Sequence, residues 1–153
     1  GSADVTYVAT APDRPDDKDW QIRLDLHRRR RPSHWRLLES DADLNRALRT
    51  IPQQSSVLID ALGGFVACHL DDSDLAWNDC CEALVEQLAG MGQTCVVVIE
   101  ETGWGVVPPT RIGGRFRDRL GSLAQILDRQ ADSAWLVLQG RAVDLHALSQ
   151  RVP

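Results

Sequence analysis

The sequence predicts an α/β fold whose central layer is a mainly parallel β-sheet. Four short apolar runs have the composition of strands, and longer segments with apolar residues at helical spacing separate them. Regular alternation of strands and helices is typical of a parallel sheet, because each return to the starting edge needs a crossover. The length of 153 residues suits one domain with a hydrophobic core. Because no repeat or second domain is visible, we expect a single domain over residues 1–153.

The four expected strands differ in how they are marked. Residues 56–60 and 95–99 are continuous apolar runs that end at carboxylates, the pattern of strands buried on both faces. Residues 5–10 are rich in strand formers and lead into a turn at residues 11–13. Residues 134–138 form the last run. We expect the four to be neighbouring strands of one sheet, with helices on both faces.

Caps, breakers and apolar spacing predict the helices. Asp16 and Asp17 are placed to cap a helix over residues 19–31, which Pro32 stops. A short extended piece at residues 35–39 follows. The other expected helices cover residues 42–49, 75–88, 110–130 and 143–148, and a Gly-Pro-rich loop covers residues 102–109.

Composition limits the classes of function. A net charge of −5 argues against a general nucleic-acid-binding protein, which needs a surplus of positive charge. No stretch approaches the roughly 20 apolar residues of a membrane-spanning helix. No signal peptide is visible, so we expect a cytoplasmic protein with reduced cysteines. The four cysteines form no CxxC pair and lack a histidine at zinc-ligand spacing, which disfavours a metal site built on them.

The densest charge cluster lies in residues 23–35. On a helix, Arg23, His27, Arg30 and Arg31 share one face, and consecutive arginines beside a histidine suit an anionic ligand. A solvated helix end is the alternative, because cations complement the negative end of the helix dipole. A nuclear-localisation or RNA-binding patch is a third interpretation, which the acidic remainder of the chain disfavours.

Polar residues follow the expected strands at the edge where parallel sheets bind ligands. Asp60 closes one strand in the place where nucleotide-binding enzymes hold magnesium, although many buried strands end in aspartate. Glu100 and Glu101 follow the next strand, and helix capping is the alternative for them. The remaining residues that directly follow expected strands are Thr10, Ala11, Gln139 and Gly140.

Two later segments have a specific composition. Residues 103–108 read Gly-Trp-Gly-Val-Val-Pro, which indicates a loop with demanding backbone geometry. In the next helix, Arg115, Asp118 and Arg119 share one face. A salt-bridged surface would show the same spacing, so this second segment does not assign a function by itself.

Together these segments resemble, in order, those of the bifunctional adenosylcobinamide kinase/adenosylcobinamide-phosphate guanylyltransferase family of cobalamin biosynthesis. The resemblance covers residues 4–148, and its most specific parts are the Gly-Trp-Gly-Val-Val-Pro and Arg-Phe-Arg-Asp motifs. Residues 20–21 and 100–102 are similar to the cyanobacterial branch. The resemblance implies a three-layer fold like that of P-loop NTPases. The matching segments are residues 7–10, residues 23–32 with His34 and Trp35, residues 57–60, residues 103–108 and residues 115–118.

The resemblance also implies an activity. Members phosphorylate the aminopropanol hydroxyl of adenosylcobinamide, then transfer GMP from GTP onto that phosphate. His27 matches the histidine that carries GMP as a phosphoramidate, and Asp60 matches an acidic position that would hold Mg²⁺. ATP and GTP are the expected nucleotide substrates, and a homotrimer with sites between subunits is the expected assembly. The residues that match nucleotide-binding positions are Ala9, Thr10, Ala11, Arg28, Arg29, Arg30, Arg31, Glu39 and Asp60.

The chain departs from the family pattern at its start. Members open with a strand, a Gly-x-x-x-x-Gly-Lys-Ser loop and a helix, and Lys18 is not preceded by glycines. Because that loop holds the β- and γ-phosphates, we expect the gene to encode this unit upstream of residue 1. We also expect these 153 residues alone to lack kinase activity. The alternative is a non-catalytic nucleotide- or corrinoid-binding scaffold subunit that has lost the loop. The retained His27 favours the enzyme.

Overall fold

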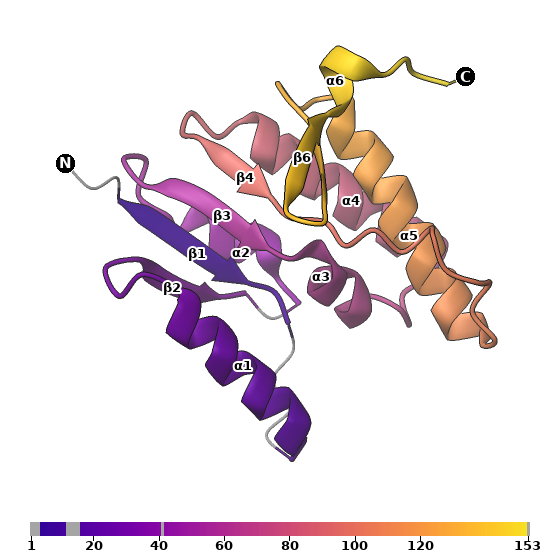
Figure 1. Ribbon diagram of the computed structural model, residues 1–153, viewed down its shortest axis with the longest axis horizontal. Helices are drawn as coiled ribbons and strands as arrows, with labels where there is room; N and C mark the ends of the chain where they lie inside the picture. Colours follow the sequence, from indigo (N-terminus) through magenta and orange to yellow (C-terminus); the bar gives the residue numbers. More distant parts are fainter. Residues whose placement is uncertain (1–3, 12–15, 41, 153) are drawn as a thin grey trace.

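The computed structural model describes residues 4–11, 16–40 and 42–152, without the side chain of Arg23. Strands and helices alternate through most of it (Figure 1). Residues 12 and 13 of the expected turn lie outside this description. The strands are β1 (Val5–Ala9), β2 (Arg36–Glu39), β3 (Ser56–Asp60), β4 (Cys95–Val97), β5 (Trp135–Leu138) and β6 (Arg141–Asp144). The helices are α1 (Lys18–Arg30), α2 (Leu44–Arg49), α3 (Leu62–Cys68), α4 (Asp74–Ala89), α5 (Arg111–Asp128) and α6 (Leu145–Leu148).

The main sheet has four strands in the order β2-β1-β3-β4, and every neighbouring pair is parallel. This confirms the α/β class and the parallel sheet expected from the sequence. The short extended piece before Ser40 is a full member of the sheet, because β2 pairs with β1 along its whole length. All four strands end at the same edge, and the residues after them therefore gather there.

Helices lie on both faces of the sheet, as expected, but unequally. The chain moves one way across the sheet from β1 to β2, and the other way from β2 to β3 and on to β4. Because crossovers between parallel strands are right-handed, these opposite moves put α1 on one face and the later helices on the other. Figure 1 shows α1 by itself beside β2, apart from the group of α2, α3, α4 and α5.

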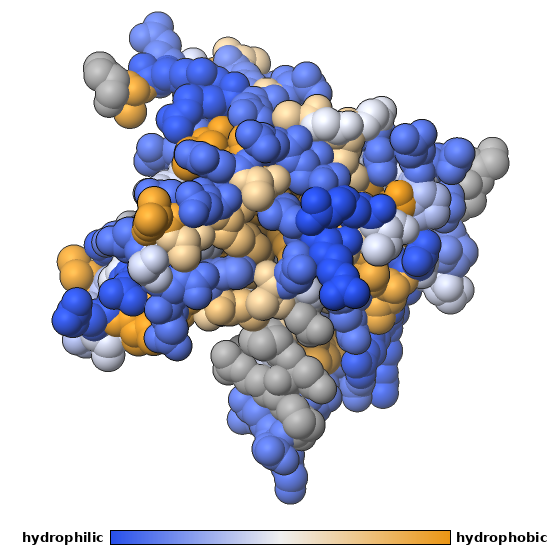
Figure 2. Space-filling view, turned by 180° about the vertical axis from the view of Figure 1, so that it is seen from behind, coloured by the Kyte–Doolittle hydropathy of each residue, from blue (hydrophilic) through white to orange (hydrophobic). Residues whose placement is uncertain are grey.

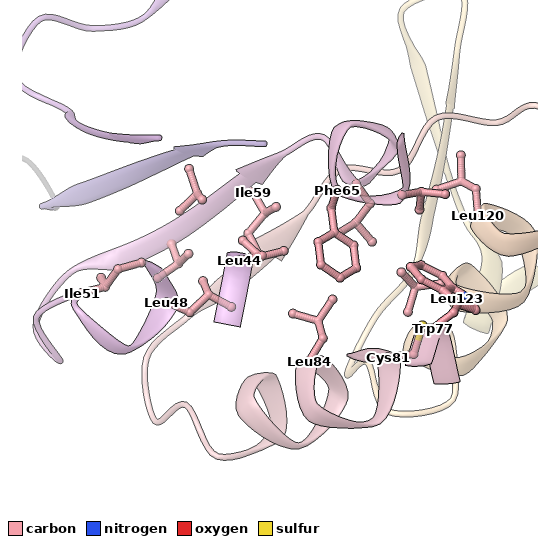
Figure 3. Packing of buried hydrophobic residues seen from close by; sticks show 14 residues of the cluster. Leu44, Leu48, Ile51, Ile59, Phe65, Trp77, Cys81, Leu84, Leu120 and Leu123 are labelled. Atoms are coloured by element: carbon pink, nitrogen blue, oxygen red, sulfur yellow. The ribbon is translucent and has the colours of Figure 1, made fainter. Parts of the chain in front are cut away.

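The hydrophobic core lies between the sheet and that group of helices (Figure 3). Val8 and Ile59 are fully buried on the sheet side. Phe65 of α3, Leu84 of α4 and Leu120 of α5 meet them from the helices. Seen from behind, the surface is mainly hydrophilic, with a pale, weakly apolar area across its middle and scattered strongly hydrophobic residues (Figure 2).

The ends of the long helices follow the sequence signals. The Asp17 carboxylate accepts the backbone N–H of Trp20 at 2.9 Å, which caps α1. The helix ends at Arg31, whose backbone is extended (φ −74°, ψ 134°) because it precedes Pro32. The side chains of Asp43, Ser73, Thr110 and Asp144 cap α2, α4, α5 and α6 in the same way.

The last expected strand does not join the main sheet, so that expectation is wrong. β5 pairs antiparallel with β6, and the two form a separate sheet. Gln139 (φ 52°) and Gly140 (φ 74°) form the two-residue turn between them, and positive φ at both positions matches the twist of a hairpin. The helix expected over residues 143–148 begins at Leu145 for the same reason. Gln139 and Gly140 are thus hairpin residues, not part of a ligand-binding edge.

Helix α3 is an element that the sequence did not predict. It contains Gly63 and Gly64, which usually interrupt helices. Both glycines are close-approach positions: a Cβ on Gly63 would lie 2.5 Å from the Glu100 carboxylate, and one on Gly64 would lie 2.6 Å from the backbone of Thr10. Glycine is therefore required at position 64, whereas a side chain at position 63 would displace the Glu100 carboxylate. The cost of the two glycines to the helix is offset by the buried Phe65.

Arg115 and Arg119, which the sequence placed on one face of a helix, mainly hold helix α5 against the α3–α4 connection. Arg119 is 5% exposed, and its guanidinium donates to the carbonyl oxygens of His69 at 2.5 Å and Asp72 at 2.8 Å. Arg115 donates to another carbonyl of the α3–α4 connection. The arginines of this motif therefore fasten α5 to that connection.

Replacing Arg119 by methionine should lower the free energy of unfolding by about 3 kcal/mol, because two part-buried carbonyl oxygens lose their donors. The partner Asp74 is 93% exposed, so its ion pair with Arg119 adds little. Arg117→Met is the matched control, since among the described residues the ion pair of Arg117 is with the exposed Asp118. It should cost less than about 1 kcal/mol. Urea unfolding measures both, and equal losses would contradict the assignment.

The cysteines of the described residues are free thiols. Burial is the main cause that raises the pKa of Cys81 to about 12 and that of Cys95 to about 11. Both side chains pack in or against the core, so both cysteines behave as small apolar residues. Over residues 4–11, 16–40 and 42–152, no helix has the length and apolar character needed to span a bilayer.

Candidate active site

The last residues of strands β1, β2 and β3 are small or acidic and lie in register with one another at the edge of the sheet. Ala9 is in register with Glu39 on one side and with Asp60 on the other. Paired residues of parallel strands point to the same face, and strands lie about 4.8 Å apart, so roughly 10 Å separates the Cα atoms of the two acidic residues. Two carboxylates therefore flank an alanine on the α1 face of the sheet. Asp60 is half-buried, and Glu39 is exposed.

Tyr7 connects this edge to helix α1. Its hydroxyl donates a hydrogen bond to Oδ2 of Asp60 at 2.8 Å, a diagonal contact between neighbouring strands. The guanidinium of Arg31 lies over the Tyr7 ring, 5.2 Å from its centre. Burial, and then the hydrogen bond to Asp60 and its charge, raise the pKa of Tyr7, while Arg31 lowers it. The net shift is upward, so the hydroxyl remains a donor near neutral pH.

The basic run forms the exposed end of α1. His27 and the arginines at positions 28–30 are exposed, and Arg31 is half-buried. Arg28 forms a surface ion pair with Asp25 at 3.2 Å, which adds little stability. The backbone N–H of Arg31 donates to the His27 carbonyl at 3.3 Å, so the two residues lie one helical turn apart. The contact of Arg31 with Tyr7 therefore attaches this end of α1 to the α1 face of the sheet.

A cavity of about 220 Å³ lies beyond the strand ends, lined by residues of α1, α3 and α5 and by the segments that follow β1, β3 and β4. Thr10 is fully buried there and donates through Oγ1 to the Ala61 carbonyl. Glu100 accepts the Gly63 N–H at 2.8 Å, so it caps α3, which was the alternative proposed for it. Glu101 accepts the Gly103 N–H at 2.6 Å within its own loop. The cavity is lined by Thr10, Ala11, Trp20, Ala61, Gly63, Gly64, Ala67, Glu100 and Phe116.

The carboxylates of this edge fit a magnesium ion that arrives with a nucleotide. Mg²⁺ in such sites is held by one or two protein carboxylates, by substrate phosphates and by water. Asp60 keeps Oδ1 in addition to the oxygen that Tyr7 contacts, and Glu39 lies two strands away on the same face. Within the described residues, no three acidic, histidine or cysteine side chains form a metal-binding group. A cage built from protein alone is therefore not the arrangement found here.

The structure brings most of the predicted site residues to one edge but divides them between two places. Ala9, Glu39 and Asp60 lie side by side on the α1 face, and Arg31 joins them through Tyr7. Residues 10 and 11 line the cavity instead. Residues 27–30 stand on the exposed helix end.

The contacts of Tyr7 were not anticipated from the sequence. The one available signal was alternation along β1: Tyr7 lies two residues before Ala9 and so shares its face.

Comparison with known proteins bears on this site. Residues 1–145 match the family model CobU, described as cobinamide kinase/cobinamide phosphate guanyltransferase. The bifunctional adenosylcobalamin biosynthesis protein CobU of Escherichia coli K12 is 30% identical over 159 residues, which cover 94% of this chain and 87% of that protein.

Two further relatives agree. CobP of Pseudomonas aeruginosa is 32% identical over 143 residues, covering 92% of this chain and 82% of its own length. CobU of Salmonella typhimurium LT2 is 30% identical over 156 residues, covering 92% and 85%. Both carry the name of bifunctional adenosylcobalamin biosynthesis proteins. With the match over residues 1–145 and the parallel sheet described above, the chain belongs to the cobinamide kinase/cobinamide phosphate guanyltransferase family of cobalamin biosynthesis.

Proposed function

We propose that this protein phosphorylates adenosylcobinamide and transfers GMP from GTP to that phosphate through a guanylylated His27. The attachment of α1 to the sheet supports this most directly. Arg31, one turn after His27, lies over Tyr7, and the Tyr7 hydroxyl contacts Asp60. The histidine-arginine end of α1 is thereby tied to the edge that carries Asp60 and Glu39.

In the first half of the guanylyl transfer, an imidazole nitrogen of His27 attacks the α-phosphorus of GTP. The N–P bond forms as the bond to the bridging oxygen breaks, and pyrophosphate leaves with that electron pair. The other ring nitrogen gives up its proton to solvent. His27 is exposed on α1, so its ring is accessible to a nucleotide. The arginines at positions 28–31 offset the negative charge that develops on the phosphate oxygens.

In the second half, a phosphate oxygen of adenosylcobinamide phosphate attacks the same phosphorus. A P–O bond forms, the P–N bond breaks, and His27 regains a neutral ring after taking up one proton. The product is adenosyl-GDP-cobinamide. Covalent catalysis of this kind divides one difficult transfer into two easier ones, and it requires His27 to be accessible to both substrates in turn.

The kinase reaction transfers the γ-phosphoryl group of ATP or GTP to the aminopropanol hydroxyl. This chemistry depends on holding and neutralising phosphates. Mg²⁺ supplies such neutralisation when it is bound with the nucleotide, and Asp60 with Glu39 would hold it. The half-buried position of Asp60, fixed by Tyr7, suits a carboxylate with that task. The homotrimer expected from the family stays a prediction.

The proposal is tested with GTP labelled at the α-phosphate. The protein, as its gene encodes it, should acquire a covalent label that acid removes and alkali does not, as a phosphoramidate behaves. GTP labelled at the γ-phosphate should leave no label, because pyrophosphate departs. A scaffold subunit, the alternative function, would bind GTP at equilibrium without any covalent label. That result would overturn the proposal.

A further inference from the structure

Tyr7 is the only tyrosine of the chain, and it makes two contacts of different kinds at the sheet edge. Its hydroxyl donates to Asp60 at 2.8 Å, and its ring face lies 5.2 Å from the guanidinium carbon of Arg31. Asp60 stands on β3 and Arg31 stands at the end of α1. A single side chain therefore links an acidic and a basic residue that come from different elements.

We propose that Tyr7 is a positioning residue that fixes Asp60 and Arg31 relative to each other, so that the phosphates of GTP meet both at once. The inference rests on the proposed function, because it assigns a role within the same site. Tyr7 itself is not assigned contact with substrate. It acts through the two residues on either side of it.

The hydroxyl contact determines how Asp60 is presented. A carboxylate at the end of a strand can turn about its side-chain bonds, and a hydrogen bond to Oδ2 holds one orientation. Because the phenol group is a single donor, Oδ1 stays available for a nucleotide-bound cation. Hydrogen bonds to charged groups are stronger than neutral ones. Loss of the hydroxyl should therefore weaken binding of the cation more than it weakens the fold.

The contact with the Tyr7 ring determines the position of the Arg31 side chain, the last of the basic run. Arg31 has left the helix with an extended backbone, so the helix itself no longer fixes its side chain. The arginines at positions 28–30 repel it, whereas the face of an aromatic ring attracts a guanidinium. Tyr7 is a half-buried residue of strand β1, so the sheet holds its backbone in place even if the segment after α1 moves. Its ring is a fixed support at the point where α1 meets the sheet.

Two variants separate the two contacts. Tyr7→Phe removes the hydroxyl and keeps the ring, whereas Tyr7→Leu removes both. We expect Tyr7→Phe to raise the Mg²⁺ concentration for half-maximal guanylyl labelling about tenfold, the effect of one hydrogen bond to a charged group. Tyr7→Leu should in addition raise the half-saturating GTP concentration about fivefold, because the cation–π support of Arg31 is lost. Val96→Ala, an exposed residue of the same sheet outside the site, should change neither value.

A second measurement does not depend on activity. Because the chain has one tyrosine, incorporation of 3-fluorotyrosine gives one ¹⁹F resonance, from position 7. Asp60→Asn and Arg31→Met should each move that resonance in the free protein, and GTP with Mg²⁺ should move it in the wild type. Val96→Ala should leave it in place. If the chemical shift of this resonance is the same in Asp60→Asn and Arg31→Met as in the wild type, the inference is overturned.

The outcomes distinguish the two proposals. If wild-type protein forms no guanylyl label, the proposed function fails, while the ¹⁹F result still reports on the Tyr7 contacts. If the label forms and Tyr7→Phe keeps the wild-type Mg²⁺ dependence, the proposed function stands and the positioning role is wrong. Should Tyr7→Leu fail to fold, Tyr7→Phe and the ¹⁹F shifts decide the question.

Discussion

Replacing His27 by alanine should abolish covalent guanylylation and lower the transferase rate by a factor of about 10³ or more, because no other group then forms the P–N bond. The kinase rate should fall much less, since that chemistry uses no covalent histidine. His27 is exposed on α1, so the substitution leaves the core intact. The measurement is labelling by α-phosphate-labelled GTP, followed by separate assays of the two half-reactions.

His34→Ala is the matched control for this experiment. His34 is also an exposed histidine beside the basic run, but it lies beyond Pro32 and outside the helix. It should keep the label at the wild-type level. A label that survives in His27→Ala and disappears in His34→Ala would show that the nucleophile has been misassigned.

The second large effect is expected at Asp60. Asp60→Asn keeps the size of the side chain and an oxygen that can accept the Tyr7 hydrogen bond, but it removes the charge that attracts Mg²⁺. Both the kinase and the transferase rate should fall about a hundredfold at low Mg²⁺, with partial recovery as Mg²⁺ is raised. Rates measured across a Mg²⁺ titration test this.

Asp79→Asn provides the comparison, because Asp79 is an exposed carboxylate on α4. It should follow the wild-type titration. If Asp60→Asn also matched the wild type at limiting Mg²⁺, Asp60 would be a structural residue that orients Tyr7 and nothing more.

The elements of the parallel sheet were predictable because their signals are local. A continuous apolar run closed by an aspartate identified β3, and Asp17 with Pro32 bracketed α1. The hairpin was not predictable in the same way. The run at residues 134–138 resembles a central strand, and only the positive φ values of Gln139 and Gly140 turn it back on itself. Gln139 gave no signal of this turn in the sequence, since Asn or Asp is the usual residue at the first position of such a turn.

The candidate site, too, contains features that local sequence signals predict and features that depend on tertiary contacts. The place of Asp60 at the sheet edge was predictable because a parallel sheet collects strand ends there, whereas Ala9 was named only through the family resemblance. The role of Tyr7 was not predictable, because it depends on a diagonal contact to β3 and on where Arg31 leaves α1. The sequence left the role of Arg119 open, because helical spacing does not show that its donors end on the part-buried carbonyls of the α3–α4 connection.

The paired glycines of α3 have a consequence for how the chain tolerates change. Gly63 leaves room for the Glu100 carboxylate, and Gly64 leaves room for the backbone of Thr10. A side chain at position 63 would require the Glu100 carboxylate to move or position 100 to carry a shorter side chain, so substitutions at these two positions are not independent. Position 64 has no such partner, because backbone atoms cannot be shortened. One glycine can therefore change together with another residue, whereas the adjacent glycine has no compensating substitution.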